Sequence, residues 1–268
     1  MLPYINLPDW YIPLPFKILG TDRLPIHFFG ILVAIGVLIG IWLARKRAKP
    51  MGIDPDKLES MINWMLLCGF AGAHILDEIF YHPEEIAKNP LSLLLFWEGI
   101  SSMGGFTGAA IGIFLWKKYK NGNKPLLPYA DLILSVYPFA WIFGRMGCAS
   151  VHDHKGMLAS APNIFTVAFP DGPHYDLGLL EMLYTILLAV FVASLWHKKR
   201  PPGTYIGVTC TLYAPVRFFL DFLRLDSGPT GDRRYLYLTF AQWTCVALLA
   251  FGIHMLIKSR RLARTSVA

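Results

Sequence analysis

The sequence predicts an all-α polytopic membrane protein with seven transmembrane helices, an N-terminus outside and a C-terminus in the cytoplasm. First, 54% of its 268 residues are hydrophobic, 16% are charged and the mean hydropathy is +0.44, which is too apolar for a soluble domain. Second, seven apolar stretches are long enough to cross hydrocarbon about 30 Å thick. Third, basic residues collect after every second stretch, as expected of cytoplasmic loops.

The seven stretches each approach the length of about 20 residues that an apolar helix needs to cross a bilayer. They lie near residues 27–45, 58–80, 101–117, 129–150, 176–197, 203–224 and 238–257. The third begins in "SMGGFTGAAIG", whose glycines predict a small-residue face for close helix packing. Segment 84–97, "EEIAKNPLSLLLFW", is too short to span, so we expect a helix in the membrane interface with Trp97 in the aromatic belt.

Orientation follows from four basic clusters, after the first, third, fifth and seventh stretches. They are Arg45, Lys46, Arg47 and Lys49; Lys117, Lys118, Lys120 and Lys124; Lys198, Lys199 and Arg200; and Lys258, Arg260, Arg261 and Arg264. The net charge of +7 is therefore a topology signal, and no nucleic-acid partner is expected. We expect one integral membrane domain over residues 1–268, with a small extracytoplasmic cap at about 150–175.

The four cysteines, Cys68, Cys148, Cys210 and Cys245, form no Cys-x-x-Cys pair and predict neither a disulfide nor a zinc site. Cys148 is either a small packing residue or a reactive thiol beside Arg145. The segment "VHDHK" at 151–155 has three interpretations: a solvated outer loop, a source of a catalytic histidine, or a His-x-His metal site without a partner cluster. We therefore predict no metal and no cofactor.

Ionisable residues within the stretches are the functional candidates, because a lone charge at mid-membrane costs at least about 2.5–3.5 kcal/mol. All lie toward the outer ends: His74, Asp77, Glu78, Arg145, Glu181, Arg217, Asp221 and Arg224. Spacings of three and four residues place several on shared helix faces, so buried ion pairs that hold helices together are one interpretation. For Arg145 and Arg217 we favour a phosphate site, since guanidinium groups bind phosphate bidentately. A phosphate bound within the bilayer indicates a phospholipid headgroup.

Four segments, "WEGISSMGGFTGAAIG", "YPFAWIFGRMGCASVHDHKG", "DLGLLEMLY" and "YAPVRFFLDFLRLDSGPTGDRRYLYLTFAQW", occur in this order. Over about residues 20–257 the chain resembles the bacterial prolipoprotein diacylglyceryl transferases. The resemblance implies seven spans in the cytoplasmic (inner) membrane and an active site toward the periplasm. It also implies transfer of the diacylglyceryl group of phosphatidylglycerol to the lipobox cysteine thiol of a prolipoprotein, releasing glycerol phosphate. The expected partners are phosphatidylglycerol or a similar anionic phospholipid and the prolipoprotein signal peptide.

The resemblance also assigns residues. Arg145 stands at the essential arginine of the family signature, Arg217 at a second functional arginine and Arg224 at a third basic position. The predicted substrate-binding residues are Arg224, Asp221, Glu181, Gly104, Gly105, His74 and Gln242.

The chain departs from the family pattern at several positions. Met103 stands where the family has a histidine and Phe29 where it has a tyrosine; Cys148 and Val151 replace asparagines, Asp153 a glutamate, and His74 an arginine. Thioether formation needs charge on the leaving phosphate and a base for the thiol, and Met103 cannot supply the base. His152, His154 or His74 would be a relocated base. The predicted catalytic residues are Arg145, Arg217, His152, His154 and Asp153.

Alternative functions remain at this stage. One is a non-catalytic phospholipid-binding membrane paralogue, another a transferase with a different acceptor. A small-anion transporter has less support, because the sequence contains no inverted repeat.

Overall fold

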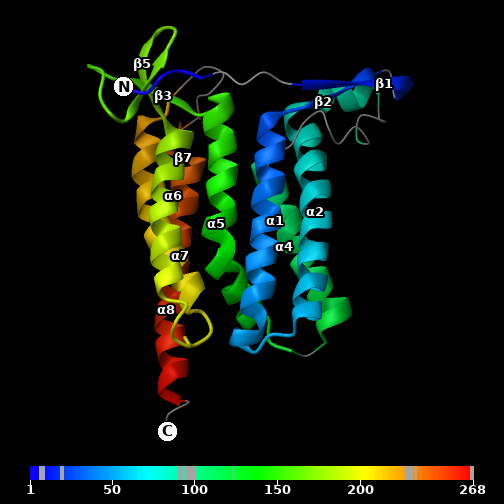
Figure 1. Ribbon diagram of the computed structural model, residues 1–268, viewed down its shortest axis with the longest axis vertical. Helices are drawn as coiled ribbons and strands as arrows, with labels where there is room; N and C mark the ends of the chain where they lie inside the picture. The colour runs from blue at the N-terminus through cyan, green and yellow to red at the C-terminus, as the bar shows by residue number, and fades with distance from the viewer. Residues whose placement is uncertain are drawn as a thin grey trace. The chain divides into compact units, whose positions relative to one another are not determined.

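The computed structural model describes residues 1–5, 10–18, 21–89, 93, 101–122, 124–226, 232 and 234–265. Each predicted span corresponds to a helix (Figure 1): α1 (Phe28–Ala48), α2 (Pro55–Tyr81), α4 (Ser102–Trp116), α5 (Leu127–Val151), α6 (Leu177–Ser194), α7 (Thr204–Leu220) and α8 (Phe240–Thr265). Among the described residues, five segments are long and apolar enough to cross a membrane: Phe28–Met51, Leu127–Val151, Leu177–Ser194, Thr204–Leu223 and Phe240–Arg264. The chain is therefore mostly helical and polytopic, whereas α2 and α4 are not among these five.

Short strands are the departure from the predicted all-α fold. The predicted cap folds as a three-stranded antiparallel sheet in the order β3 (Lys155–Leu158), β5 (Gly172–Asp176), β4 (Thr166–Phe169). Leu2 extends the sheet, since its N–H donates to the Thr166 carbonyl and its carbonyl accepts from Ala168 N–H. Two further hairpins are β1 (Trp10–Ile18) with β2 (Thr21–Ile26) and β6 (Arg234–Tyr235) with β7 (Leu238–Thr239). Strands as short as two to five residues carry too little periodicity for sequence prediction.

The short elements include two 3₁₀ turns, η1 (Lys49–Met51) and η4 (Asp221–Leu223), and one π-helical turn, η3 (Lys117–Asn121). The predicted interfacial segment 84–97 is described mainly as α3 (Pro83–Lys88). Trp97 lies outside the described residues.

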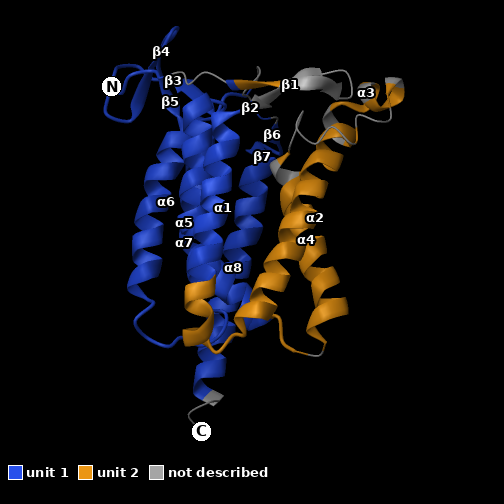
Figure 2. Cartoon of the chain, turned by 45° about the vertical axis from the view of Figure 1, so that its right-hand side comes forward, with its two compact units in different colours: residues 1–10, 26–44, 127–268 blue, residues 11–25, 45–126 orange. Residues whose placement is uncertain are grey.

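The chain divides into two compact units (Figure 2). Unit 1 comprises residues 1–10, 26–44 and 127–268, and so holds most of α1, helices α5 to α8 and the cap. Unit 2 comprises residues 11–25 and 45–126, and holds helices α2 to α4. The single membrane domain over residues 1–268 stays a prediction.

The glycine face packs α4 against α2 within unit 2. A Cβ built at Gly108 would lie 2.1 Å from the carbonyl oxygen of Cys68, and one at Gly104 would lie 2.3 Å from that of Gly72. Such distances exclude any side chain, so the two backbones touch along this seam. The prediction of a packing face is confirmed.

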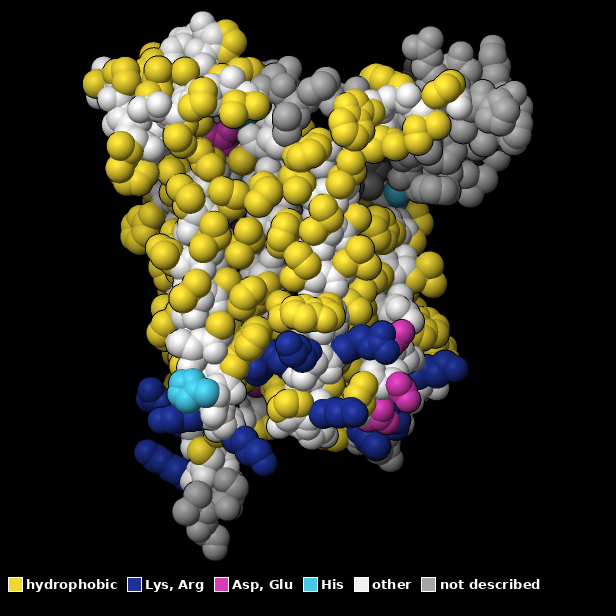
Figure 3. Space-filling view, viewed as in Figure 1, with side chains coloured by type: hydrophobic (Ala, Val, Ile, Leu, Met, Phe, Trp, Pro, Cys, Tyr) yellow, Lys and Arg dark blue, Asp and Glu magenta, His cyan; other side chains and the backbone are white. Residues whose placement is uncertain are grey.

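The surface of unit 1 is apolar along its helices and basic beyond the end opposite the cap. Figure 3 shows the hydrophobic band and the lysine and arginine side chains below it. In unit 1 the basic residues follow α6 and end α8: Lys198, Lys199, Arg200, Lys258, Arg260, Arg261 and Arg264. The two ends of unit 1 thus differ chemically, with the cap at one end and the basic residues at the other, as expected for the two sides of a membrane.

Candidate active site

Two arginines from different helices of unit 1 converge on one buried carboxylate. Arg145 Nε on α5 lies 3.1 Å from Glu181 Oε1, and Arg217 Nε on α7 lies 3.4 Å from Glu181 Oε2. Glu181 on α6 is 2% exposed, and both arginine side chains are 11% exposed. The structure therefore brings the two predicted arginines together, with the predicted Glu181 between them.

Aromatic side chains one helical turn before each arginine complete this contact. Trp141 lies under Arg145, with the guanidinium carbon 4.5 Å from the ring centroid. Its indole N–H lies 3.3 Å from Glu181 Oε1 and 3.1 Å from the Tyr213 hydroxyl, which itself donates to Glu181 Oε1. Sequence reasoning missed Trp141 and Tyr213. The signal was their spacing of four residues from Arg145 and Arg217, which places each on its arginine's helix face.

A second carboxylate extends the network from Arg217. Arg217 Nη1 lies 2.6 Å from Asp221 Oδ1, and Arg224 Nε lies 3.0 Å from the same oxygen. The hydroxyl of Thr239, the last residue of β7 before α8, donates to Asp221 Oδ2. Asp221 is fully buried, and the predicted ion pairs at spacings of four and three residues are present. Arg224 also lies 3.2 Å from the half-exposed Asp232.

Gln242 positions this end of the network. It is fully buried on α8; its Oε1 accepts from the Thr239 N–H at 2.9 Å and its Nε2 donates to the Phe218 carbonyl at 3.2 Å. These bonds join α8 to α7 and hold Thr239 against Asp221. Its contacts are therefore those of a positioning residue.

Within the part of the chain that the structure describes, one edge of Arg145 faces no acidic side chain. Its Nη1 contacts Cys148 Sγ at 3.7 Å, and a thiol is a weak acceptor. An anionic oxygen at this edge would form a charge-assisted hydrogen bond, about twice as strong as a neutral one. The Cys148 side of Arg145 is accordingly where the network would gain most from binding a phosphate.

The end of α5 brings two predicted residues to Cys148. After Val151 the backbone of His152 is left-handed, with φ of 53°, which ends the helix and reverses the chain. As a result a carboxylate oxygen of Asp153, a ring nitrogen of His154 and Cys148 Sγ all lie within 4.8 Å of one another. His154 therefore lies next to Cys148, which in turn contacts Arg145.

His152, in contrast, holds the cap. Its Nδ1 lies 2.6 Å from Asp176 Oδ2, its Nε2 lies 3.2 Å from the Ile5 carbonyl, and its ring stacks on Tyr4 at 4.3 Å. Asp176 also caps α6, since its Oδ1 accepts from the Leu179 N–H at 3.0 Å. Burial raises the pKa of the Asp176 carboxyl, and the hydrogen bond to His152 acts in the opposite direction. With both ring nitrogens engaged, His152 is less suited than His154 to serve as a base.

Three predicted binding residues belong to unit 2. His74 is buried on α2, one turn from the buried Glu78, while Gly104 and Gly105 lie at the start of α4. A Cβ at Gly105 would meet Ala73 Cβ at an ordinary 3.7 Å, so only Gly104 is required for packing. The side chain of Met103 lies outside the described residues.

Phe29, at the family's tyrosine position, packs on α5. A Cβ at Gly147 would lie 2.7 Å from Phe29 Cδ2, so Gly147 is required for this contact two residues beyond Arg145. The aromatic ring is therefore kept beside the arginine helix, without a hydroxyl.

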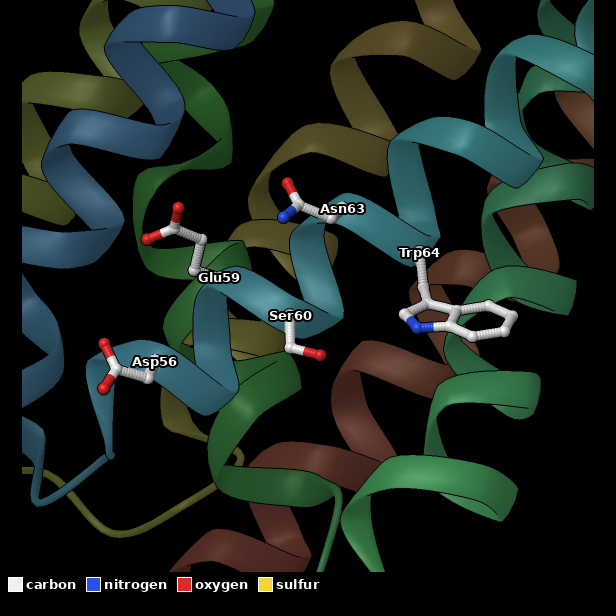
Figure 4. Close-up of a pocket in the computed structure, with 5 residues that line it drawn as sticks. All are labelled: Asp56, Glu59, Ser60, Asn63 and Trp64. Carbon is white, nitrogen blue, oxygen red and sulfur yellow. The ribbon is translucent and has the colours of Figure 1, made fainter.

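An open pocket of about 440 Å³ lies elsewhere, in unit 2. Its lining residues, Asp56, Glu59, Ser60, Asn63 and Trp64, all come from the first turns of α2 (Figure 4). Glu59 Oε2 pairs with Arg45 Nη2 at 3.2 Å, and Ser60 accepts from Trp116 Nε1 at 3.2 Å. Glu59 and Ser60 thus join α2 to its neighbours, and none of the five lining residues is a predicted site residue.

Fold and site together define a polytopic membrane protein with a buried cationic site built from three of its helices. Comparison with known proteins then names the family. A model of the prolipoprotein diacylglyceryl transferases matches residues 16–258, and the chain belongs to that family.

Several relatives are named phosphatidylglycerol–prolipoprotein diacylglyceryl transferase. One from Nitratidesulfovibrio vulgaris is 26% identical, with 91% of this chain and 94% of the relative covered. Others come from Wigglesworthia glossinidia brevipalpis (26% identical, 96% and 99% covered) and Chromohalobacter salexigens (27% identical, 97% and 96% covered).

Proposed function

We propose that this protein transfers the diacylglyceryl group of phosphatidylglycerol to the cysteine thiol of a prolipoprotein. The observation that carries the proposal is the joint contact of Arg145 and Arg217 with Glu181, while the Nη1 edge of Arg145 contacts the Cys148 thiol. Family membership supports the reaction, and this geometry supports a phosphate site at the two arginines.

The leaving group gains negative charge as the bond from glyceryl carbon to oxygen breaks. Arg145 and Arg217 would stabilise that charge, because cationic donors held in place in a dry site need no reorganisation during the reaction. Glu181 and Asp221 hold the guanidinium planes and reduce the electrostatic cost of burying them. Arg224, Gln242 and Thr239 support Asp221 from the other side.

For the base we favour His154, which lies 3.0 Å from Asp153 and beside Cys148. Imidazole is the side chain that most readily accepts a proton near neutral pH. His74, Gly104 and Gly105, in unit 2, remain predicted substrate-binding residues.

The topology that fits this reaction has seven spans, with the N-terminus and the cap outside the cytoplasmic membrane of a bacterium and the basic ends inside. The positive-inside rule supports this orientation for unit 1. The arginine network lies on the cap side of unit 1, as the bridge between Gly156 and Arg224 indicates. The signal peptide of the prolipoprotein would reach it from the periplasmic side.

The test uses purified protein in phosphatidylglycerol vesicles with a lipobox peptide. A lipidated peptide and released glycerol phosphate are expected. Arg145→Ala and Arg217→Ala should each lower the rate by about 10²–10³-fold or more, as for the loss of one donor to a developing anion. Arg200→Ala, in the loop after α6, is the matched control and should keep the wild-type rate. Bound anionic lipid without any product would contradict the proposal and favour a non-catalytic lipid-binding protein.

A further inference from the structure

Three potential metal ligands meet at the end of α5. Cys148 Sγ, a carboxylate oxygen of Asp153 and a ring nitrogen of His154 lie within 4.8 Å of one another. Cys148 is 7% exposed, whereas the side chains of His154 and Asp153 are 22% and 43% exposed. The cluster therefore has a buried sulfur at its base and opens toward the surface.

The orientation of the His154 ring is better suited to binding a cation together with Asp153 than to a hydrogen bond with Asp153. Its Nδ1 lies 3.0 Å from Asp153 Oδ1, yet this buried nitrogen makes no hydrogen bond to any atom of the described chain. The two atoms are close, but they do not point at each other. Two ligands of one cation adopt this relation, because both lone pairs aim at a third point.

The charge of the cluster fits a divalent cation. One thiolate, one carboxylate and one neutral imidazole carry two negative charges, so a bound divalent ion leaves the cluster neutral. This matters because Arg145 Nη1 lies 3.7 Å from Cys148 Sγ and would repel a cluster with net positive charge.

We propose that Cys148, Asp153 and His154 bind a zinc-type divalent cation whose fourth position is open to the acceptor thiol. Sulfur and imidazole ligands select zinc over magnesium or calcium, and three protein ligands with one open position are typical of catalytic zinc. The inference rests on the proposed function, since it gives that reaction its thiol-activating group.

The group transfer balances with this site. Coordination displaces the proton of the acceptor thiol to solvent, because a thiol bound to zinc is deprotonated. A sulfur electron pair then forms the bond to the glyceryl carbon. The pair of the breaking carbon–oxygen bond stays on the phosphate oxygen, and glycerol phosphate leaves with one more negative charge than the lipid phosphate had.

In this arrangement the acceptor thiol binds at the cation and the leaving phosphate binds at Arg145, which are adjacent. Cys148 is both a proposed metal ligand and the neighbour of the Arg145 edge assigned to the phosphate. A nucleophile at the cation and a leaving group at Arg145 are thereby held near each other, which lowers the entropic cost of their reaction. In this arrangement His154 serves as a metal ligand in place of the base role given above, and no base is needed at Met103.

Metal content is the first measurement. Full-length protein purified with Zn²⁺ and freed of excess ion should retain about one Zn²⁺ per chain, as one three-ligand site predicts. Cys148→Asn and His154→Ala should lower the Zn²⁺ affinity by more than about 100-fold, since even residues behind the ligands contribute 10–100-fold. The matched controls are Cys210→Ala, in an apolar cluster of α7, and the exposed His197→Ala. Zinc retained equally by Cys148→Asn would overturn the inference.

Spectroscopy of the unmutated protein provides a test that does not depend on whether the variants fold. Replacing zinc with Co²⁺ should produce a sulfur-to-cobalt charge-transfer band and tetrahedral ligand-field bands, and zinc should abolish both. Wild-type protein without the charge-transfer band has no cysteine-ligated site, which refutes the proposal.

Transferase activity separates this inference from the proposed function. Chelation should lower the rate of peptide lipidation, and added Zn²⁺ should restore it. Full activity in metal-free protein would refute the metal site and leave the transferase intact. Zinc bound through Cys148 without any lipidation would support the metal site and contradict the transferase.

Discussion

The two units bury very different interiors. In unit 1, Glu181 and Asp221 each contact two arginines, so the charges of these buried carboxylates are balanced. In unit 2, α2 and α4 meet through glycine backbones such as Gly108 against Cys68. The first interior depends on charge balance and the second on the absence of side-chain volume. Substitutions that alter charge should therefore damage unit 1, and those that alter volume should damage unit 2.

The largest effect is expected from Glu181→Gln. The change keeps the side-chain size but removes the negative charge shared by Arg145 and Arg217. Loss of one partner from a buried ion pair costs about 3–5 kcal/mol. The free energy of unfolding in detergent micelles should fall by that amount, and transferase activity should be lost.

The control is Asp226→Asn, whose side chain is 71% exposed and pairs with Arg234. An exposed pair contributes about 0–1 kcal/mol, so this variant should unfold like the wild type. Anionic phospholipid should also restore stability to Glu181→Gln more than a zwitterionic lipid does. Equal stability of the two variants would show that charge balance does not hold unit 1 together.

Gly108→Ala tests the other interior. The added methyl group would lie 2.1 Å from the Cys68 carbonyl, so α2 and α4 must separate. Overpacking of this kind costs about 1–3 kcal/mol. Gly69→Ala is the matched control on α2, because its nearest neighbour would be an acceptable 3.5 Å away. Since alanine is favoured over glycine in a helix by about 1 kcal/mol, Gly69→Ala should be neutral or stabilising. Thermal unfolding of both variants provides the measurement, and a stable Gly108→Ala would argue against a rigid seam.

Helix positions could be predicted because seven long apolar stretches leave few alternatives. The observed α5 (Leu127–Val151) differs from the predicted 129–150 by only a few residues. The cap could be located but not described, because its fold depends on contacts distant in sequence, such as Leu2 with Thr166. Nothing in a strand of four or five residues specifies such a partner.

The arginines could be predicted because buried charge is costly and therefore informative. Glu181 and Asp221 were found as ionisable residues within the apolar stretches, and Gln242 was found from the family resemblance. The structure places all three in the same network. Tyr213 and Trp141 were missed because an aromatic residue in an apolar stretch is ordinary. The proximity of Cys148 to His154 could not be predicted either, since it depends on the left-handed backbone of His152.

The smallest effect concerns pH, and it compares two carboxylates of the cap. Burial raises the pKa of Asp176, so the folded state holds its proton more tightly than the unfolded chain does. Its contribution to stability is complete below the unfolded pKa of about 3.9 and is lost as pH rises through the folded value. The hydrogen bond from Lys155 lowers the pKa of Asp171, so that contribution is present above about pH 3.9 and is lost as pH falls through the folded value.

Asparagine substitutions distinguish these two opposite pH dependences of stability. Asp176→Asn keeps a side-chain oxygen to cap α6, whereas Asp176→Ala loses the cap at about 0.5–2 kcal/mol. In Asp176→Asn the decline of the unfolding temperature above about pH 4 should therefore flatten without loss of the cap. Asp171→Asn should instead flatten the decline on the acid side and leave the neutral range nearly unchanged, because its pair with Lys155 is exposed at the carboxylate. If both variants altered the same side of the profile, burial of Asp176 would not be the cause of its raised pKa.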